Sequence, residues 1–230
     1  MRGEGDGSPT RFRDRREGGW LLARRLAKHR ASERAIVLGL PRGGVVPAVE
    51  IARALKLPLD VIISRKLRDP HRPDFAIGAV AEGGEPYLVP RFEPASAAWQ
   101  AYVEREIGHQ RAEIVRRQQL YRGGAPLRLR PGATVILVDD GVETAATVIA
   151  AIDALRRQPI ERLVFAVPVV PLETLHRLEP LVDELVVLTA PGLFWAVRGF
   201  YEDFTQISEA EVCEGLEEAH RELPPPGTGT

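Results

Sequence analysis

Residues Thr134–Thr147 read T-V-I-L-V-D-D-G-V-E-T-A-A-T. The apolar run Val135–Val138 leads directly into two adjacent acids, Asp139 and Asp140, and an apolar-periodic segment follows a short polar loop. This order predicts a buried strand, a ligand loop and a helix. Two carboxylates at the end of a buried strand need water, a metal or hydroxyl groups as partners. Because ligands bind at the carboxyl ends of strands in open parallel sheets, we expect a binding site here.

Strand and helix patterns alternate along the rest of the chain. Ala35–Leu40 and Leu59–Ser64 are predicted strands, and a helix is predicted over Val45–Leu55 between them. Further patterns predict a hairpin strand over Phe75–Ala81, a long helix with a solvated Arg/Glu face over Ala97–Tyr121, a strand over Leu163–Val169 stopped by Pro168 and Pro171, a helix over Leu172–Leu181 and a strand over Leu185–Leu188. The alternation predicts an α/β fold with a central, mostly parallel sheet flanked by helices.

Composition narrows the function classes. The 230 residues are 44% hydrophobic with a net charge of −1, which fits one core-forming domain and gives no reason to expect a nucleic-acid partner. The single cysteine, Cys213, excludes an internal disulfide. No apolar stretch approaches the roughly 20 residues that span a bilayer, and residues 1–10 lack a signal-peptide core, so we expect a cytoplasmic protein without a membrane partner. Residues 1–10 are expected to be disordered, and 213–230 to be a helix end and a loose tail.

The motif around the acid pair resembles the 5-phospho-ribosyl diphosphate (PRPP) motif of type I phosphoribosyltransferases, in which hydrophobic residues precede two acids and T-G-x-T. Thr144 and Thr147 match the two threonines, and Ala145 stands where the family usually has glycine. The resemblance covers about Phe12 to Val212 and is closest to a bacterial group of stand-alone phosphoribosyltransferase-like proteins. Those proteins share P-R-G-G-V, R-K, F-A-I-G-A-V, V-D-D-G and A-V-x-x-x-Y-x-D-F, all found here. The resemblance implies one domain over residues 11–212, with a small C-terminal hood at about 190–212.

The resemblance also assigns roles around the motif. The carboxylates of Asp139 and Asp140 would accept hydrogen bonds from the ribose hydroxyls. The 5-phosphate of PRPP would bind the loop and the following helix N-terminus, through Gly141, Val142, Thr144, Ala145, Ala146 and Thr147. Mg²⁺ would be bound through PRPP, and the phosphoribosyl group would pass to a small-molecule acceptor, a nitrogenous base, with release of pyrophosphate. Whether the alanine in the glycine position permits PRPP binding depends on its φ angle, which the sequence leaves open.

Two basic segments are candidates for binding pyrophosphate. Arg42, Gly43 and Gly44 follow the first strand and resemble the pyrophosphate loop of the same family, although R-G-G after a strand is often only a turn. Arg65 and Lys66 end the second predicted strand, where they would bind pyrophosphate or remain a solvated strand end. Lys66, which would neutralise the departing charge, and Glu143, which would handle a proton of the base, are the catalytic candidates. The alternative for Glu143 is an exposed loop glutamate.

Three further features carry open alternatives. Phe194, Trp195, Phe200 and Tyr201 are candidates for stacking on a planar acceptor, and core packing is the alternative use of these rings. Arg68–Pro90 would form either a loop that closes over the site or an ordinary surface hairpin. The histidines show no ligand spacing, so we expect no metal held by the protein alone.

Other classes of protein fit the same residues less well. A receiver domain requires a lysine near its C-terminus, and no lysine follows Lys66 here. The G-x-G-x-x-G motif of Rossmann dehydrogenases and the Walker A motif G-x-x-x-x-G-K are also absent from the sequence. The serious alternative is a non-catalytic sensor or regulator that binds PRPP or a nucleotide on the same fold. The acceptor and the oligomeric state, a homodimer included, stay open.

Overall fold

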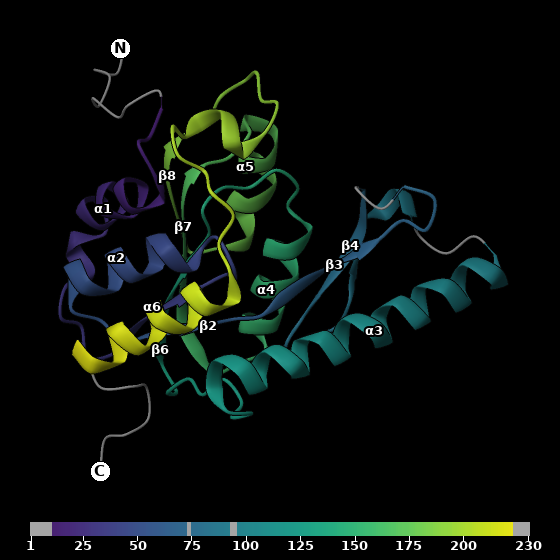
Figure 1. Ribbon diagram of the computed structural model, residues 1–230, viewed down its shortest axis with the longest axis horizontal. Helices are drawn as coiled ribbons and strands as arrows, with labels where there is room; N and C mark the ends of the chain where they lie inside the picture. Colours follow the sequence, from purple (N-terminus) through teal and green to yellow (C-terminus); the bar gives the residue numbers. More distant parts are fainter. Residues whose placement is uncertain (1–10, 73–74, 93–95, 223–230) are drawn as a thin grey trace.

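A five-stranded parallel sheet forms the centre of the protein (Figure 1). The computed structural model describes residues 11–72, 75–92 and 96–222, so the predicted tails at 1–10 and 223–230 lie outside the described residues. The strand order is β2-β1-β6-β7-β8, and every neighbouring pair is parallel. The strands are β1 (Ala35–Gly39), β2 (Leu59–Val61), β6 (Ala133–Val138), β7 (Ile160–Val169) and β8 (Glu184–Thr189). The predicted parallel α/β fold is therefore confirmed.

Helices cover both faces of this sheet (Figure 1). On one face lie α1 (Arg15–Arg25), α2 (Val45–Leu55) and α6 (Glu209–Glu222). On the other lie α4 (Ala146–Arg156) and α5 (Leu172–Leu178), so the helix predicted over Leu172–Leu181 ends early and continues as a short 3₁₀ turn. Further 3₁₀ turns are η1 (Ala27–His29), η2 (Pro90–Phe92), η3 (Glu179–Leu181) and η4 (Val197–Phe200).

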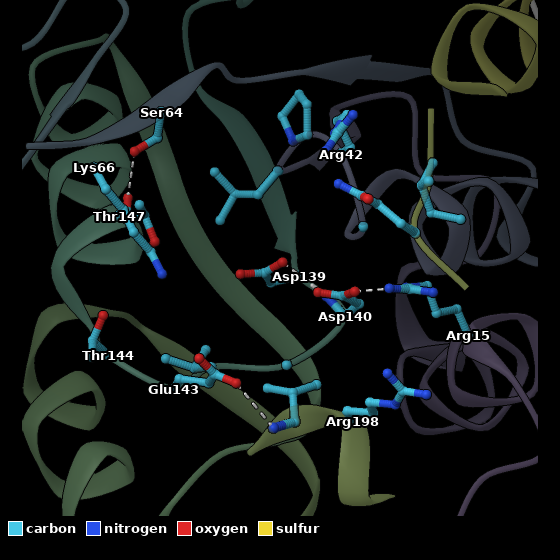
Figure 2. A pocket seen from close by; sticks show the side chains of 18 of the residues that line it. Arg15, Arg42, Ser64, Lys66, Asp139, Asp140, Glu143, Thr144, Thr147 and Arg198 are labelled. Atoms are coloured by element: carbon cyan, nitrogen blue, oxygen red, sulfur yellow. Dashed lines mark hydrogen bonds and ion pairs between the residues drawn. The ribbon is translucent and has the colours of Figure 1, made fainter. Parts of the chain in front are cut away.

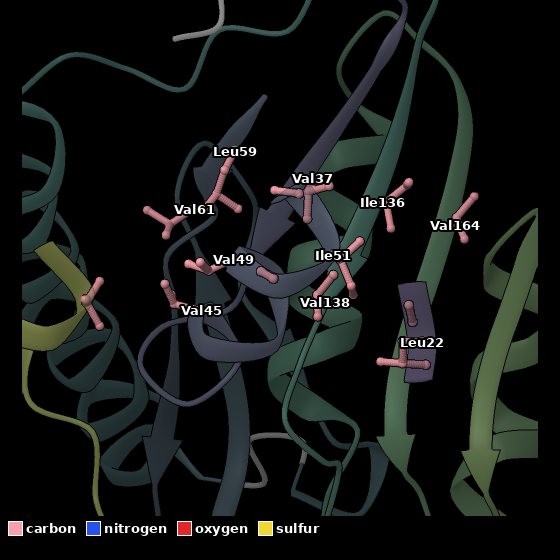
Figure 3. Close-up of a cluster of buried hydrophobic side chains, with 14 of the residues drawn as sticks. Leu22, Val37, Val45, Val49, Ile51, Leu59, Val61, Ile136, Val138 and Val164 are labelled. Atoms are coloured by element: carbon pink, nitrogen blue, oxygen red, sulfur yellow. The ribbon is translucent and has the colours of Figure 1, made fainter. Parts of the chain in front are cut away.

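Alternate strand residues supply two separate cores. Val37, Ile136 and Val164 face α1 and α2, where they pack near Leu22 and Ile51 (Figure 3). Their chain neighbours, such as Ile36, Leu137 and Phe165, are buried against the α4 and α5 side. Because successive side chains of a strand point to opposite faces, continuous apolar runs are what a sheet covered on both sides requires.

A second, antiparallel sheet projects from the central one (Figure 1). It contains β3 (Ser64–Arg68), β4 (Ala76–Ala81) and β5 (Tyr87–Leu88), and α3 (Ala97–Arg122) runs alongside it. The single strand predicted over Leu59–Ser64 is wrong, because the chain leaves the central sheet after Val61. The Ile63 amide donates to Glu82 Oε1 instead, and Ser64 begins β3. Arg65 and Lys66 consequently lie within β3 rather than at the end of a central strand.

Two other expectations also need correction. Pro168 does not stop β7, which continues to Val169; the β7–β8 pairing passes from Val167 to Val169, so the missing proline amide interrupts little of the ladder. The polar face of α3 is not fully solvated either. Gln110 and Arg117 are buried where α3 meets β3 and α6.

Candidate active site

A cavity of about 560 Å³ opens at the carboxyl ends of β1 and β6. Its walls come from Arg15 of α1, the loop after β1, strand β3, the loop from β6 to α4, and the segment from η4 to the start of α6. The loop after the first strand and the acid-pair loop therefore meet at one edge of the sheet. Parallel pairing of β1 with β6 brings it about, because Gly39 lies opposite Val138.

The two loops touch, and glycine is required at the contact. A Cβ atom on Gly43 would overlap the carboxylate of Asp140, and one on Gly44 would lie 2.7 Å from the Val138 carbonyl oxygen and 2.8 Å from Asp139 Cα. Neither the backbone at Val138 and Asp139 nor the Asp140 carboxylate can move far enough to accommodate such an atom at a small energetic cost. The R-G-G sequence is thus more than a generic turn, since it permits the β1 loop to pack directly on the acid pair.

Helix α4 begins at the cavity without a side-chain cap. Ala145 occupies the N-cap position with φ −70° and ψ −8°, and no side chain accepts from the first-turn amides. These free amides and the helix dipole together favour the binding of an oxyanion at the N-terminus of α4. The negative φ also settles the conformational question at this position, because alanine adopts it without strain. Thr144 and Thr147 line the cavity, whereas Ala145 and Ala146 are buried.

Asp140 is held by an arginine that the sequence did not single out. Arg15 of α1 donates from Nε to Asp140 Oδ2 at 2.6 Å, and from Nη1 to the Thr205 carbonyl oxygen at 2.8 Å. Its guanidinium carbon lies 3.7 Å from the centroid of the Phe204 ring. The hydroxyl of Tyr201 donates to the Asp140 carbonyl oxygen at 2.6 Å. The second aspartate is therefore tied to both the N-terminal helix and the C-terminal segment (Figure 2).

Asp139 lies beside Asp140 and points toward the middle of the cavity (Figure 2). Its Oδ1 accepts from the Asp140 amide at 2.9 Å. Burial, with a further contribution from the neighbouring Asp140 charge, raises the pKa of Asp139 well above its usual range. Lys66 acts in the opposite direction, because its positive charge favours the ionised carboxylate.

The basic residues of β3 divide between two environments. Lys66 is exposed and lies near Thr147 across the cavity wall (Figure 2). Ser64 Oγ donates to the Thr147 carbonyl oxygen at 2.9 Å and thereby joins β3 to the first turn of α4. Arg65 lines the cavity as well, but its Nε donates to Gln110 Oε1 of α3 at 3.0 Å. Arg42 also lines the cavity, on the β1 loop.

Glu143 is exposed at the cavity, and its Oε1 accepts from the Val197 amide of η4 at 3.3 Å. A Cβ atom on Gly141 would overlap the Val197 side chain, so the acid-pair loop packs closely on η4. The carboxylate therefore bridges the loop and the C-terminal segment.

None of the four predicted stacking aromatics lines the cavity. Tyr201 is 1% exposed, with its ring packed between Phe12 and Phe204, so it has no ring face open to an acceptor. Phe194 and Phe200 stack on each other with centroids 5.6 Å apart, and Trp195 is 96% exposed. Core packing, the alternative interpretation, describes Tyr201 correctly.

Several lining residues were not predicted from the sequence, namely Arg15, Ser64, Arg68, Arg198, Phe204, Gln206 and Ile207. Arg198 and Phe204 fall inside the shared A-V-x-x-x-Y-x-D-F segment, which was a usable signal. Nothing in the sequence around Arg15 indicated its role.

Within the described ranges, no group of three or more His, Cys, Asp or Glu residues could hold a metal ion. The helices of these ranges include none with the length and hydrophobicity that a membrane span requires. The donor set still suits Mg²⁺ bound mainly by a substrate. Asp139 supplies a cavity-facing carboxylate, whereas Asp140 is engaged by Arg15. Mg²⁺ commonly binds through one or two carboxylates together with substrate phosphates and water.

This arrangement defines a class of protein. A sequence profile described as the phosphoribosyl transferase domain matches residues 20–204, a range that includes all five strands of the parallel sheet. The chain belongs to the phosphoribosyltransferase domain family.

Particular relatives agree with this assignment. Two proteins of Mycobacterium tuberculosis, from strains CDC 1551 and H37Rv, are each 40% identical over 215 residues and are named "Putative phosphoribosyl transferase". The alignment covers 92% of this chain and 48% of each relative, so the chain spans about half the length of the curated relatives it matches. The protein TT1426 from Thermus thermophilus, for which there is a crystal structure, shares 44% sequence identity with this chain. The two structures superimpose with a TM-score of 0.74, and the match covers 90% of this chain and 98% of TT1426.

Proposed function

We propose that this protein binds PRPP with Mg²⁺ and transfers its phosphoribosyl group to a nitrogenous acceptor, releasing pyrophosphate. One observation carries the proposal. An uncapped helix N-terminus, a cavity-facing aspartate and a second anion-suited loop all border a single cavity. PRPP presents the complementary groups in one molecule: a 5-phosphate, a ribose diol and a pyrophosphate.

We assign each of these three PRPP groups to residues that line the cavity. The first turn of α4, with Thr144 and Thr147, would bind the 5-phosphate. Asp139 would accept hydrogen bonds from the ribose hydroxyls, with Asp140 beside it. The pyrophosphate would lie against the β1 loop, near Arg42 and Lys66. Mg²⁺, when bound, supplies positive charge to the pyrophosphate oxygens.

The chemistry of the transfer follows from these positions. The bond from ribose C1 to the pyrophosphate oxygen breaks, and its electron pair leaves with pyrophosphate. The acceptor nitrogen provides the electron pair for the new C1–N bond. Arg42 and Lys66 would stabilise the negative charge that develops on the leaving group, an effect that grows in a low-dielectric cavity. Glu143, which borders the cavity, would take a proton from an N–H acceptor.

A thermal-shift experiment tests ligand binding. Because a ligand that binds only the native state stabilises it, PRPP at 100 times its Kd should add about 2.7 kcal/mol to the free energy of unfolding. We expect a raised melting temperature with PRPP and Mg²⁺ together and a smaller rise with either alone. Pyrophosphate release in the presence of bases then measures turnover. No shift at millimolar Mg²⁺·PRPP would contradict the proposal.

The second candidate is a PRPP or nucleotide sensor without turnover. The observation in its favour is the ion pair from Arg15 to Asp140, which occupies one of the two carboxylates that the ribose would use. A thermal shift with no pyrophosphate release across a broad panel of acceptors would support the sensor over the transferase.

A further inference from the structure

The cavity has chemically different walls on the two sides of the aspartate pair. Arg42 and Lys66 lie on one side of Asp139, and Arg198 lies on the other, on the side of Glu143 (Figure 2). Arg198 belongs to η4, far along the chain from the β1 loop and β3 that carry the first two cations.

If the proposed function holds, the acceptor must bind beside the wall that contains Arg198. Pyrophosphate would depart along the Arg42 and Lys66 side. A nucleophile that displaces it approaches ribose C1 from the opposite face, so that the forming and breaking bonds are aligned. The acceptor would therefore lie against the wall formed by Val197, Arg198 and Phe204.

This wall offers a guanidinium rather than an open aromatic ring. Among the described residues, Phe204 is the one aromatic side chain lining the cavity, and its ring already contacts the Arg15 guanidinium at 3.7 Å and the Tyr201 ring at 5.0 Å. In contrast, the Arg198 side chain is exposed and has no ion-pair partner in the part of the chain that the structure describes.

Within the described residues, the two carboxylates on this side of the cavity, Asp140 and Glu143, form no ion pair with Arg198. Asp140 is paired with Arg15, and Glu143 Oε1 accepts from the Val197 amide. The wall therefore presents one positive charge in a planar fork, whose geometry matches a carboxylate bidentately. A phosphate dianion would leave surplus negative charge beside Asp139, Asp140 and Glu143, so a single carboxylate is the better fit.

The geometry points to an acceptor that carries a carboxylate, a carboxylated nitrogen heterocycle or aromatic amine, with Arg198 as the residue that recognises this group. The inference rests on the proposed function and narrows its substrate class. The acceptor nitrogen forms the bond to C1, pyrophosphate leaves with the electron pair of the C1–O bond, and the carboxylate takes no part in the bond changes. An N–H proton, where the acceptor has one, passes to Glu143.

Matched pairs of acceptors test the inference. The protein, saturated with Mg²⁺·PRPP, is offered nicotinate against nicotinamide, orotate against uracil, and anthranilate against aniline. Binding is read as an additional thermal shift and turnover as pyrophosphate release. We expect the carboxylate member of at least one pair to bind at least tenfold more tightly than its neutral partner. Arg198→Gln should remove most of that preference. The Kd of this variant for Mg²⁺·PRPP, measured without an acceptor, should stay within twofold of the wild-type value.

Arg128→Gln is the matched control, because Arg128 is exposed and does not line the cavity. This variant should retain the full preference. Neutral partners that bind as well as the carboxylates, a preference that survives in Arg198→Gln, or no response to any carboxylate would each overturn the inference while PRPP binding stands. Absence of the Mg²⁺·PRPP shift itself would instead remove the proposed function, and the inference with it.

Discussion

The contact between Arg15 and Asp140 shows how a single residue far along the chain completes this site. The two residues are 125 positions apart, and both side chains are largely buried, at 8% and 14% exposure. A buried carboxylate that loses its partner is costly, because its charge is left without compensation. Arg15 thus acts as a positioning residue: it holds the acid that neighbours Asp139 and also contacts Phe204 and the Thr205 carbonyl.

We expect Arg15→Gln to lower the free energy of unfolding by roughly 3–5 kcal/mol, the cost of breaking a buried pair from one side. Adding Asp140→Asn should recover part of that loss, because the uncompensated charge is then gone. Chemical denaturation of the four members of this cycle measures the coupling. Arg16→Gln is the control: Arg16 is exposed and pairs with Glu50, so its loss should cost no more than about 1 kcal/mol. Purely additive effects of the two substitutions would contradict the role given to Arg15.

Asp139 should make PRPP binding depend on pH. Its pKa is raised well above the ordinary value of 3.8, and ribose hydroxyls donate to the ionised form. Affinity should therefore rise with pH through the raised pKa and fall below it, by up to tenfold per pH unit. The sign for stability is opposite: the folded protein holds this proton more tightly than the unfolded chain, so the stability contributed by Asp139 is present at low pH and is lost as pH rises from about 3.8 through the raised pKa.

Calorimetric titration of Mg²⁺·PRPP across pH measures this dependence. Asp139→Asn is the control for ionisation of the PRPP phosphates, since it keeps the shape of the side chain and cannot ionise. A pH dependence of equal slope in wild type and Asp139→Asn would show that Asp139 is not the titrating group.

At this scale the sequence located the acid pair and the glycine loop, and it missed Arg15. Adjacent acids after an apolar run are a local pattern, because burial of the strand leaves carboxylates with few acceptable environments. Arg15 belongs to the charged run R-F-R-D-R-R-E at residues 11–17, and an arginine in such a run looks like any solvated side chain. Its burial depends on the packing of α1 against the C-terminal segment, which local sequence does not encode.

At the scale of elements, the start of α4 provides the anion-binding feature that the proposed chemistry needs. The helix has no acidic residue in its first turn and no side-chain cap, and its N-cap residue is buried. An anion would stabilise such an end, since it complements both the free amides and the dipole. A native helix left uncapped at a cavity is consistent with a ligand taking the place of the cap.

Thr147→Asp should therefore have opposite effects on stability and on ligand binding. A carboxylate in the first turn should raise the free energy of unfolding of the ligand-free protein by about 0.3–1 kcal/mol. The same charge would repel a phosphate, so the thermal shift caused by Mg²⁺·PRPP should largely disappear. Differential scanning fluorimetry with and without ligand measures both effects, and Thr147→Asn provides the uncharged control. A full ligand shift in Thr147→Asp would place the phosphate elsewhere.

Element prediction worked where a segment is buried on both sides and worked poorly where the chain changes sheets. The apolar runs of β1 and β6 are continuous, as a covered parallel strand requires. Leu59–Ser64 looked like one more such run, yet β2 ends at Val61 and Ser64 begins a strand of a different sheet. The change of direction is set by Glu82, which directly follows β4 and accepts from the Ile63 amide.

At the scale of the whole molecule, α3 connects the projecting sheet to the central domain. Glu113 accepts from Arg116 Nε at 2.8 Å and from Arg117 Nε at 3.0 Å, and both arginines also pair with Glu209 at the start of α6. Hydrogen bonds from Arg116, and then from Arg117, lower the pKa of Glu113 from 4.5 to about 2. This group of charges holds the long helix against the C-terminal one.

Glu113→Gln should lower the free energy of unfolding by about 1 kcal/mol at pH 7, a modest amount because the pair is partly exposed. The lowered pKa means that Glu113 contributes fully above about pH 4.5, and that the contribution is lost as pH falls towards 2. Wild type and variant should therefore converge at acid pH in urea denaturation. Glu104→Gln, on an exposed position of α3, should match wild type throughout. A constant difference down to pH 2 would rule out the ionised form as the source.

Local sequence was enough to identify the parallel α/β class, the glycine loop after the first strand and the acid pair. These features are local: periodicity, adjacent charges and glycines show in a few consecutive residues. Only the packed fold brings Arg15 to Asp140, buries Tyr201 away from an acceptor and places Arg198 at the cavity opposite Lys66. Such contacts join segments far apart in the chain, and they arise only when helices have packed on both faces of the sheet.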